Sequence, residues 1–202
     1  MYKLTVQGIP KLNIESLEPM HHDVIDGDLA VLKYRLFNTT VEGSTKCEVV
    51  DAKLDLQKTK LNLAMFCPLF HMYGLYEISG KILVMPIEGK GDFKMECKDY
   101  YIQVDSDIKI SQGKNGKKYI SFKSYKTKGD LQGGMIIEIN NLFNGRQKEL
   151  ADDINRFINK NWKPVANELQ GPVFNANMRI LVKNFNKYLK SIPLDELILG
   201  VD

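Results

Sequence analysis

Few residues in this sequence have the types and spacing that support catalysis or metal binding. His21, His22 and Asp23 are adjacent, so their side chains point in different directions, and the only other histidine is His71. The sequence contains no G-x-S-x-G, H-E-x-x-H or phosphate-loop motif, and Gly89-Lys90-Gly91 is only a fragment of the last. We therefore predict a protein that is not an enzyme and has no cofactor or metal site. A hydrolase whose triad assembles from distant residues is kept as an alternative.

The cysteines and one glycosylation triplet bear on the compartment of the protein. Cys47, Cys67 and Cys97 are too few for a disulfide-rich scaffold and match no zinc-ligand spacing. The triplet Asn38-Thr39-Thr40 is an acceptor for N-glycosylation. The first residues from Met1 lack the basic start and apolar stretch of a secretory signal. Either the protein is cytoplasmic or the sequence begins after processing.

Composition excludes two classes of partner. The chain has 202 residues, of which 44% are hydrophobic and 26% charged, as in an ordinary folded protein. Its net charge is +3, and the lysines are scattered among acidic residues, so no basic footprint for nucleic acid is present. No apolar run approaches about 18 residues, so we predict no transmembrane segment.

The first two-thirds of the chain reads as strands, because apolar residues alternate with polar ones and β-branched and aromatic residues are frequent. We expect a sheet over 28–140 after an N-terminal segment, 1–27. Short breakers, Ser79-Gly80 and Glu88 to Gly91 among them, separate the runs, and Asn115-Gly116 predicts a hairpin turn. The expected strands are Leu29–Thr40, Lys46–Leu56, Lys58–Phe66, Phe70–Ile78, Ile82–Ile87, Asp92–Lys98, Tyr100–Ile110, Tyr119–Thr127 and Met135–Asn140.

Helical spacing replaces this alternation towards the C-terminus and predicts a long helix over 145–190, followed by a tail, 191–202. Pro164 and Gly171-Pro172 are expected to bend or divide the helix. One continuous helix of this length would extend about 65 Å, whereas a compact globule of this size has a radius of gyration of about 16–17 Å. The upstream strands supply no helices for a bundle. We therefore predict an elongated α+β domain over 1–202, in which a strongly curved antiparallel sheet wraps around one long C-terminal helix.

Several segments resemble the insect Takeout and juvenile-hormone-binding protein family. These segments occur in the family's order along almost the whole chain. They are Gly8–Ile14 with Leu17-Glu18-Pro19, Gly80–Gly91, Asn141–Gly145, Asn159–Lys163 and Ile192–Leu197.

The resemblance implies a secreted carrier, found in haemolymph or sensory tissue, with an internal hydrophobic tunnel between sheet and helix. Its ligand would be a long lipophilic molecule, such as a juvenile-hormone-like terpenoid, a fatty acid or a quinone, and the carrier would be a monomer. The family's N-terminal helical stretch with its paired cysteine would lie before Met1, so the cysteines of this chain are not that pair. Cys47 and Cys67 are about equally far from the turn near Leu56-Gln57. A cross-strand disulfide between them, or three free thiols, are the alternatives.

A carrier needs an interior of apolar side chains with few polar anchors. Methionines suit such walls because they adapt their shape to different ligands. Tyr34, Tyr73, Tyr101 and Tyr125 each have a hydroxyl that would suit a polar head group. For most of these residues plain core packing is the competing interpretation. The residues we nominate as ligand-binding are Leu63, Met65, Met85, Phe93, Met95, Tyr101, Phe122, Ile136, Ile158, Trp162 and Phe174.

A second function class remains open. In this alternative the protein docks on a lipid surface or on a protein partner and encloses no ligand. A lipid that co-purifies with the protein in stoichiometric amount would favour the carrier, whereas empty protein that binds vesicles would favour the docking module.

Overall fold

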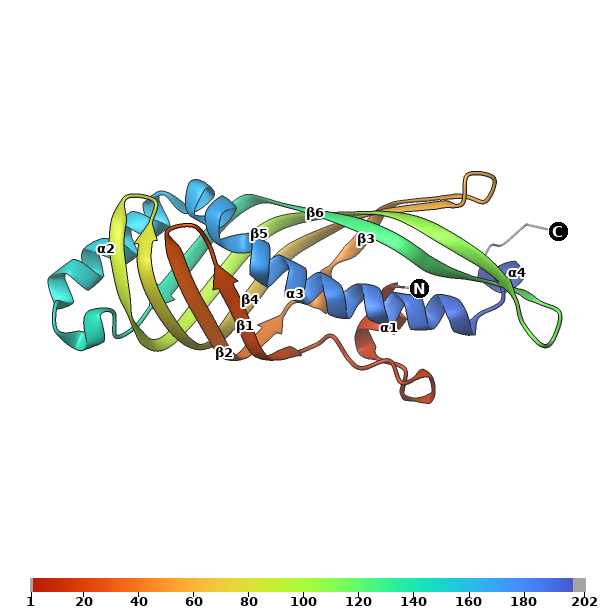
Figure 1. Cartoon of the computed structure of the whole chain (residues 1–202), viewed down its shortest axis with the longest axis horizontal. Helices are drawn as coiled ribbons and strands as arrows, with labels where there is room; N and C mark the ends of the chain where they lie inside the picture. The colour runs from red at the N-terminus through yellow and green to blue at the C-terminus, as the bar shows by residue number, and fades with distance from the viewer. Residues whose placement is uncertain (1, 198–202) are drawn as a thin grey trace.

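The computed structural model describes residues 2–197. It is an elongated molecule in which one curved sheet wraps around a long helix (Figure 1). The sheet has the order β1-β2-β4-β5-β6, β3 pairs with β4, and all pairs are antiparallel. The strands are β1 (Met20–Asp28), β2 (Leu32–Glu42), β3 (Glu48–Asp55), β4 (Lys60–Ile82), β5 (Met85–Gln112) and β6 (Lys118–Ile139).

Strand boundaries differ from those expected. β1 falls mostly inside the segment 1–27, and the nine expected runs merge into fewer, longer strands. Ser79-Gly80 and Glu88–Gly91 do not end strands, because neighbouring strands pair with them on the sheet. Gly80, at φ 128°, lies where the β1–β2 hairpin approaches, and a Cβ there would collide with the carbonyl of Val31. The turn between β4 and β5 instead falls at Leu83-Val84, which was expected to be strand.

The predicted long helix is two helices, α2 (Lys148–Lys160) and α3 (Trp162–Ser191), flanked by α1 (Tyr2–Gln7) and α4 (Leu194–Leu197). The break is at Asn161, at φ −106° and ψ 33°, and not at a proline. Pro164 lies in the first turn of α3, where its missing N–H removes no helix hydrogen bond. At Gly171 the absence of a Cβ avoids the clash with the ring of Pro172, so α3 continues. Of the expected tail, 198–202 lie outside the described residues.

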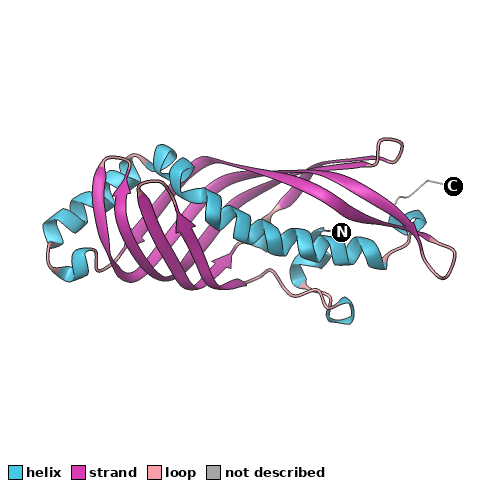
Figure 2. Ribbon diagram, in the orientation of Figure 1, coloured by secondary structure: helices cyan, strands magenta, loops and turns pink. Residues whose placement is uncertain are grey.

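β1 and β6, at the two ends of the strand order, do not pair with each other, so the sheet is not a closed barrel, and α3 lies against both (Figure 2). Two asparagines of α2 take the place of a strand partner along β6. Asn155 Oδ1 accepts the N–H of Ile139 at 3.0 Å, and its Nδ2 donates to the carbonyl of Ile139 at 3.0 Å. Asn159 forms the same two hydrogen bonds with the N–H and the carbonyl of Ile137, both at 2.8 Å. These amides satisfy backbone groups that an edge strand would otherwise leave unpaired.

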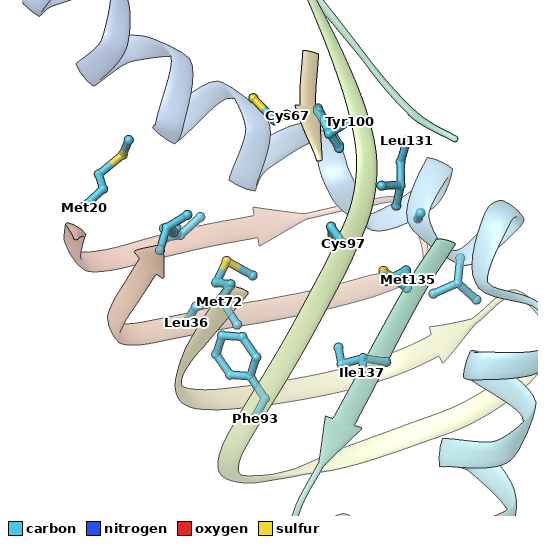
Figure 3. Packing of buried hydrophobic residues seen from close by; sticks show 14 of the residues in the cluster. Met20, Leu36, Cys67, Met72, Phe93, Cys97, Tyr100, Leu131, Met135 and Ile137 are labelled. Atoms are coloured by element: carbon cyan, nitrogen blue, oxygen red, sulfur yellow. The ribbon is translucent and has the colours of Figure 1, made fainter. Parts of the chain in front are cut away.

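The buried side chains form a large cluster and a small one. The large cluster joins the inner face of the sheet to α2 and α3 (Figure 3). The small one fills the other end of the molecule and consists of Leu61, Ile108, Ile120, Leu189 and Leu194. We call it the filled end.

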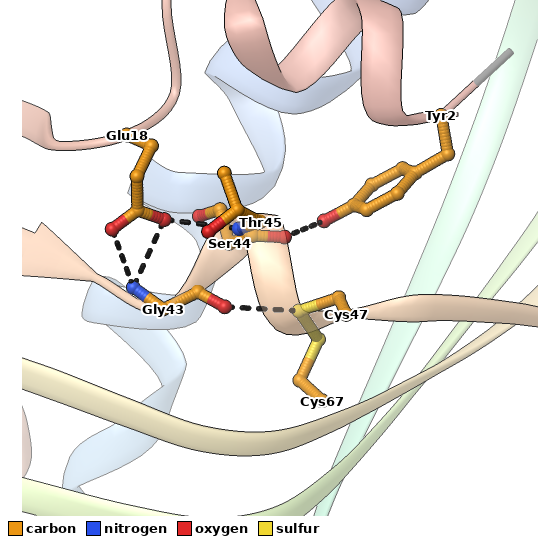
Figure 4. Close-up of a disulfide and its surroundings, with 7 residues drawn as sticks. All are labelled: Tyr2, Glu18, Gly43, Ser44, Thr45, Cys47 and Cys67. Atoms are coloured by element: carbon orange, nitrogen blue, oxygen red, sulfur yellow. Dashed lines mark hydrogen bonds between the residues drawn. A yellow bond between two sulfur atoms is a disulfide. The ribbon is translucent and has the colours of Figure 1, made fainter.

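A disulfide joins Cys47 to Cys67 (Figure 4). β3 pairs with β4 from Glu48 opposite Phe66. Cys47, one residue before Glu48, therefore lies opposite Cys67, as expected from their similar distances to the hairpin turn. Nearby, Tyr2 Oη donates to the carbonyl of Ser44 at 2.9 Å and attaches α1 to this region. Cys97 is a free, buried thiol.

Candidate functional site

An apolar cavity lies between the inner face of the sheet and α3. Its volume is about 160 Å³, whereas one water needs only about 10–15 Å³. The space therefore suits an organic molecule. Its walls are Tyr2, Leu17, Met20, Tyr34, Leu36, Val41, Ser44, Met65, Phe70, Met72, Tyr76, Ile78, Ile82, Phe93, Met95, Cys97, Tyr100, Ile102, Leu131, Met135, Ile137, Ile139, Ala166, Leu169, Gln170, Val173, Phe174, Asn177, Met178 and Leu181.

Alternation along the strands places the wall residues, with one interruption. On β5 the inward positions run Phe93, Met95, Cys97 and then Tyr100, three residues further on. The pairing with β6 shifts register between Lys98 and Tyr100, where the single residue Asp99, at φ 53°, faces two residues of β6. This bulge shifts the inward register by one residue, so Tyr100 and not Tyr101 faces the helix.

The tyrosine hydroxyls on the wall already bond to the protein. Tyr34 Oη donates to the carbonyl of Leu169 at 2.8 Å, and Tyr100 Oη donates to Gln170 Oε1 at 2.8 Å. Tyr76 Oη donates to the carbonyl of Asn140 at 2.6 Å, and burial raises the pKa of Tyr76 to about 12. Burial likewise raises the pKa of Tyr34 and Tyr100. The hydroxyls are therefore neutral, paired and oriented, and a ligand meets a nearly unbroken apolar surface.

Cys97 is the one free cysteine on this wall among residues 2–197. Burial, with a smaller contribution from Glu96, raises the pKa of its thiol to about 12. The thiolate that attacks carbonyls is thus scarce at neutral pH. Chemically, the thiol acts here as a small apolar group.

Four of the nominated residues line the cavity: Met65, Phe93, Met95 and Phe174. Leu63 and Phe122 lie around a second, much smaller void, to which Met65 also contributes. Many wall residues were missed, above all on β2, β6 and α3. The alternation of Met135, Ile137 and Ile139 with Glu138 and Asn140 was the signal for β6.

The other five nominated residues do not line the cavity. Ile136 is 57% exposed, because its neighbours Met135 and Ile137 take the inward positions. Tyr101 is 40% exposed, because the bulge at Asp99 turns Tyr100 inward and Tyr101 outward. Ile158 is fully buried in the packing of α2, while Met85 and Trp162 pack half-buried against the large cluster. Core packing accounts for these three.

Other candidate groups lie away from the cavity or are paired. Tyr73 and Tyr125 are exposed on the outside. His22 Nε2–H donates to Asn177 Oδ1 at 2.7 Å, and His21 pairs with Thr40. Over residues 2–197 no three His, Cys, Asp or Glu side chains are grouped to hold a metal, and no helix is long and apolar enough to span a membrane. Asn38 is exposed at a bulge in β2, and its glycosylation stays a prediction.

Comparison with known proteins gives a consistent result. Residues 1–199 match the family described as haemolymph juvenile hormone binding protein. The circadian clock-controlled protein daywake of Drosophila melanogaster is 26% identical over 200 residues, which cover 94% of this chain and 76% of that protein. Daywake of Drosophila yakuba is also 26% identical, over 204 residues.

A solved structure agrees over nearly the whole fold. The crystal structure of Epiphyas postvittana Takeout 1 superimposes with a TM-score of 0.91 at 28% identity, covering 96% of this chain and 89% of that one. The family match therefore covers almost all of the sequence. That sequence forms the curved sheet, the long C-terminal helix and the apolar space between them. This chain belongs to the haemolymph juvenile hormone binding protein family, a family of binding proteins.

Proposed function

We propose that this protein is a carrier that encloses one long lipophilic molecule in the cavity between the sheet and α3. The single observation that supports this proposal is the cavity itself, whose walls are almost entirely apolar and whose tyrosine hydroxyls are already bonded to the protein. Binding there is driven by removal of apolar surface from water. A juvenile-hormone-like terpenoid, a fatty acid or a quinone fits this chemistry.

The remaining features of the proposal follow from the family. We propose that the carrier is secreted, acts in haemolymph or sensory tissue, and transports its ligand as a monomer. The disulfide supports an oxidising compartment, because such bonds persist outside the cytosol. The proposed ligand lies along α3, in a tunnel to which this cavity belongs.

A substitution that fills the cavity tests the proposal. Ala166 on α3 is 3% exposed and lines the cavity, so the ring of Ala166→Phe would occupy the ligand's place. We expect the affinity for a fluorescent fatty acid to fall about tenfold or more, which corresponds to about 1.4 kcal/mol. Titration of the delipidated protein measures this, and mass spectrometry of a solvent extract identifies what the untreated protein carries.

The matched control is Ala52→Phe, the same change at an exposed position of β3 away from the cavity. It should bind the probe as the unchanged protein does, and circular dichroism checks that both variants fold. A folded Ala166→Phe protein that binds the probe with undiminished affinity would contradict the proposal. Vesicle binding by a protein that retains no lipid would favour the docking module instead.

A further inference from the structure

The main cavity and the second, smaller void share two side chains. Met65 from β4 and Leu181 from α3 line both spaces. Beyond them the smaller void is lined by Leu63, Val104, Phe122 and Phe185, among others. The two spaces therefore adjoin each other at these two residues.

The smaller void is apolar and poorly filled. Its volume is about 10 Å³, which is close to the minimum for one water, and a water also needs polar partners. Its walls expose only apolar atoms. The atoms around such a gap lack part of their dispersion contacts, so an alkyl segment that enters would restore them.

Met65 is the side chain best able to give way. It is 2% exposed, and its three rotatable side-chain bonds let a thioether adapt to a new neighbour. Movement of Met65 would join the void to the main cavity. Past the void, Leu63 and Phe122 pack against the filled end, around Leu61 and Ile120. The filled end therefore sets a limit to any extension.

We propose that the space behind Met65 and Leu181 is a subsite for the terminal alkyl segment of a long-chain ligand, and that Met65 sets the chain length that fits without rearrangement. This inference rests on the proposed carrier function. Ligands that fill only the main cavity leave Met65 in place. Longer chains must displace Met65, and so each additional methylene adds less to their affinity.

A series of saturated fatty acids of increasing length tests the subsite by displacement of the fluorescent probe. In the unchanged protein each added methylene should strengthen binding about fourfold until the chain reaches Met65, after which affinity levels off. Met65→Ala removes the three side-chain atoms beyond Cβ and should move this levelling point by about three carbons. Leu181→Ala should move it in the same direction.

The matched control is Met72→Ala, which enlarges the main cavity but does not border the void. It should change affinities across the series and leave the levelling point where it is. A levelling point that does not move in Met65→Ala, or that moves equally in Met72→Ala, overturns the subsite and leaves the carrier function standing. Failure of every fatty acid to displace the probe from the unchanged protein overturns both.

Discussion

The first and last strands of the order β1-β2-β4-β5-β6 meet the C-terminal helices through different contacts. Along β6, which we call the β6 interface, Asn155 and Asn159 each form two hydrogen bonds with the backbone of the strand. Asn186 Oδ1 accepts a further backbone N–H, from Phe122 at 2.9 Å. Along the described residues of β1, the β1 interface has one hydrogen bond to α3, between His22 and Asn177.

This difference shows which side of the cavity is held more firmly. Side-chain amides at the β6 interface replace an absent strand, and their loss would leave backbone groups buried without partners. The β1 interface relies on apolar packing and on one bond between two half-buried side chains. Tyr34 Oη adds one bond to the carbonyl of Leu169, from β2. We therefore expect the sheet to separate from the C-terminal helices at β1 before it does so at β6.

The largest expected effect is the loss of an amide at the β6 interface. Asn159→Leu keeps the size of the side chain but leaves the N–H and carbonyl of Ile137 without partners, and Ile137 is only 8% exposed. Each unpaired buried group costs about 1–3 kcal/mol. We expect the free energy of unfolding to fall by about 2–4 kcal/mol, as measured by urea denaturation.

Two controls sharpen this comparison. Asn175→Leu makes the same change on the exposed face of α3 and should have little effect. Asn177→Leu, at the β1 interface, removes one side-chain bond and should cost about 1 kcal/mol. Equal losses in Asn159→Leu and Asn177→Leu would show that the two interfaces do not differ in strength.

These asparagines also show where prediction from the sequence ends. Alternation and helical spacing were enough to predict an antiparallel sheet and a C-terminal helix, because both patterns report burial directly. The length of that helix then led to the prediction that the sheet curves around it. Asn155 and Asn159 look like ordinary polar positions of an amphipathic helix. Their role depends on the register between α2 and β6, which no local pattern encodes. For the same reason the helix break at Asn161 was missed, although Pro164 and Pro172 carry the stronger sequence signal.

The sequence indicated that apolar strand and helix residues would line an interior space, but not which of these residues do so. Met65, Phe93 and Met95 follow simple alternation and reach the cavity, whereas Tyr101 fails because the bulge at Asp99 shifts the register. Burial alone does not separate a wall residue from a core residue. Leu36 and Leu61 are both 8% exposed, yet Leu36 lines the cavity and Leu61 belongs to the filled end.

Hydrogen exchange compares the two interfaces without any substitution. The N–H groups of Ile137 and Ile139 donate to asparagine side chains, so they should exchange only when α2 separates from β6. The N–H groups of β1 that point away from β2 have no such partner among the described hydrogen bonds to α3. We expect these β1 groups to exchange about tenfold faster than those of Ile137 and Ile139. A tenfold difference corresponds to about 1.4 kcal/mol, the contribution of about one hydrogen bond. Equal protection of both sets would contradict the comparison.

The smallest expected effect is a pH dependence at the β1 interface. Burial lowers the pKa of His22, while the bond to Asn177 opposes this in part; His21 lowers the pKa further and Asp23 raises it. The unfolded chain, with a histidine pKa of about 6.5, therefore binds more protons than the folded protein just below that pH. The stabilising contribution is complete above about pH 6.5 and decreases as the pH falls through the lowered pKa.

Removal of the titrating group isolates this contribution. His22→Gln keeps a donor for Asn177 but cannot titrate, so the loss of stability between about pH 7.5 and about pH 5.5 should be smaller than in the unchanged protein. The difference should be well below the effect of Asn159→Leu, because water still reaches the half-buried imidazole and reduces the cost of charging it. His21→Gln is the matched control, since His21 bonds to Thr40 within the sheet and not to α3. Urea midpoints at the two pH values measure the effect. If His22→Gln and His21→Gln change the pH dependence equally, the bond from His22 to α3 is not its source, and the β1 interface depends on apolar packing alone.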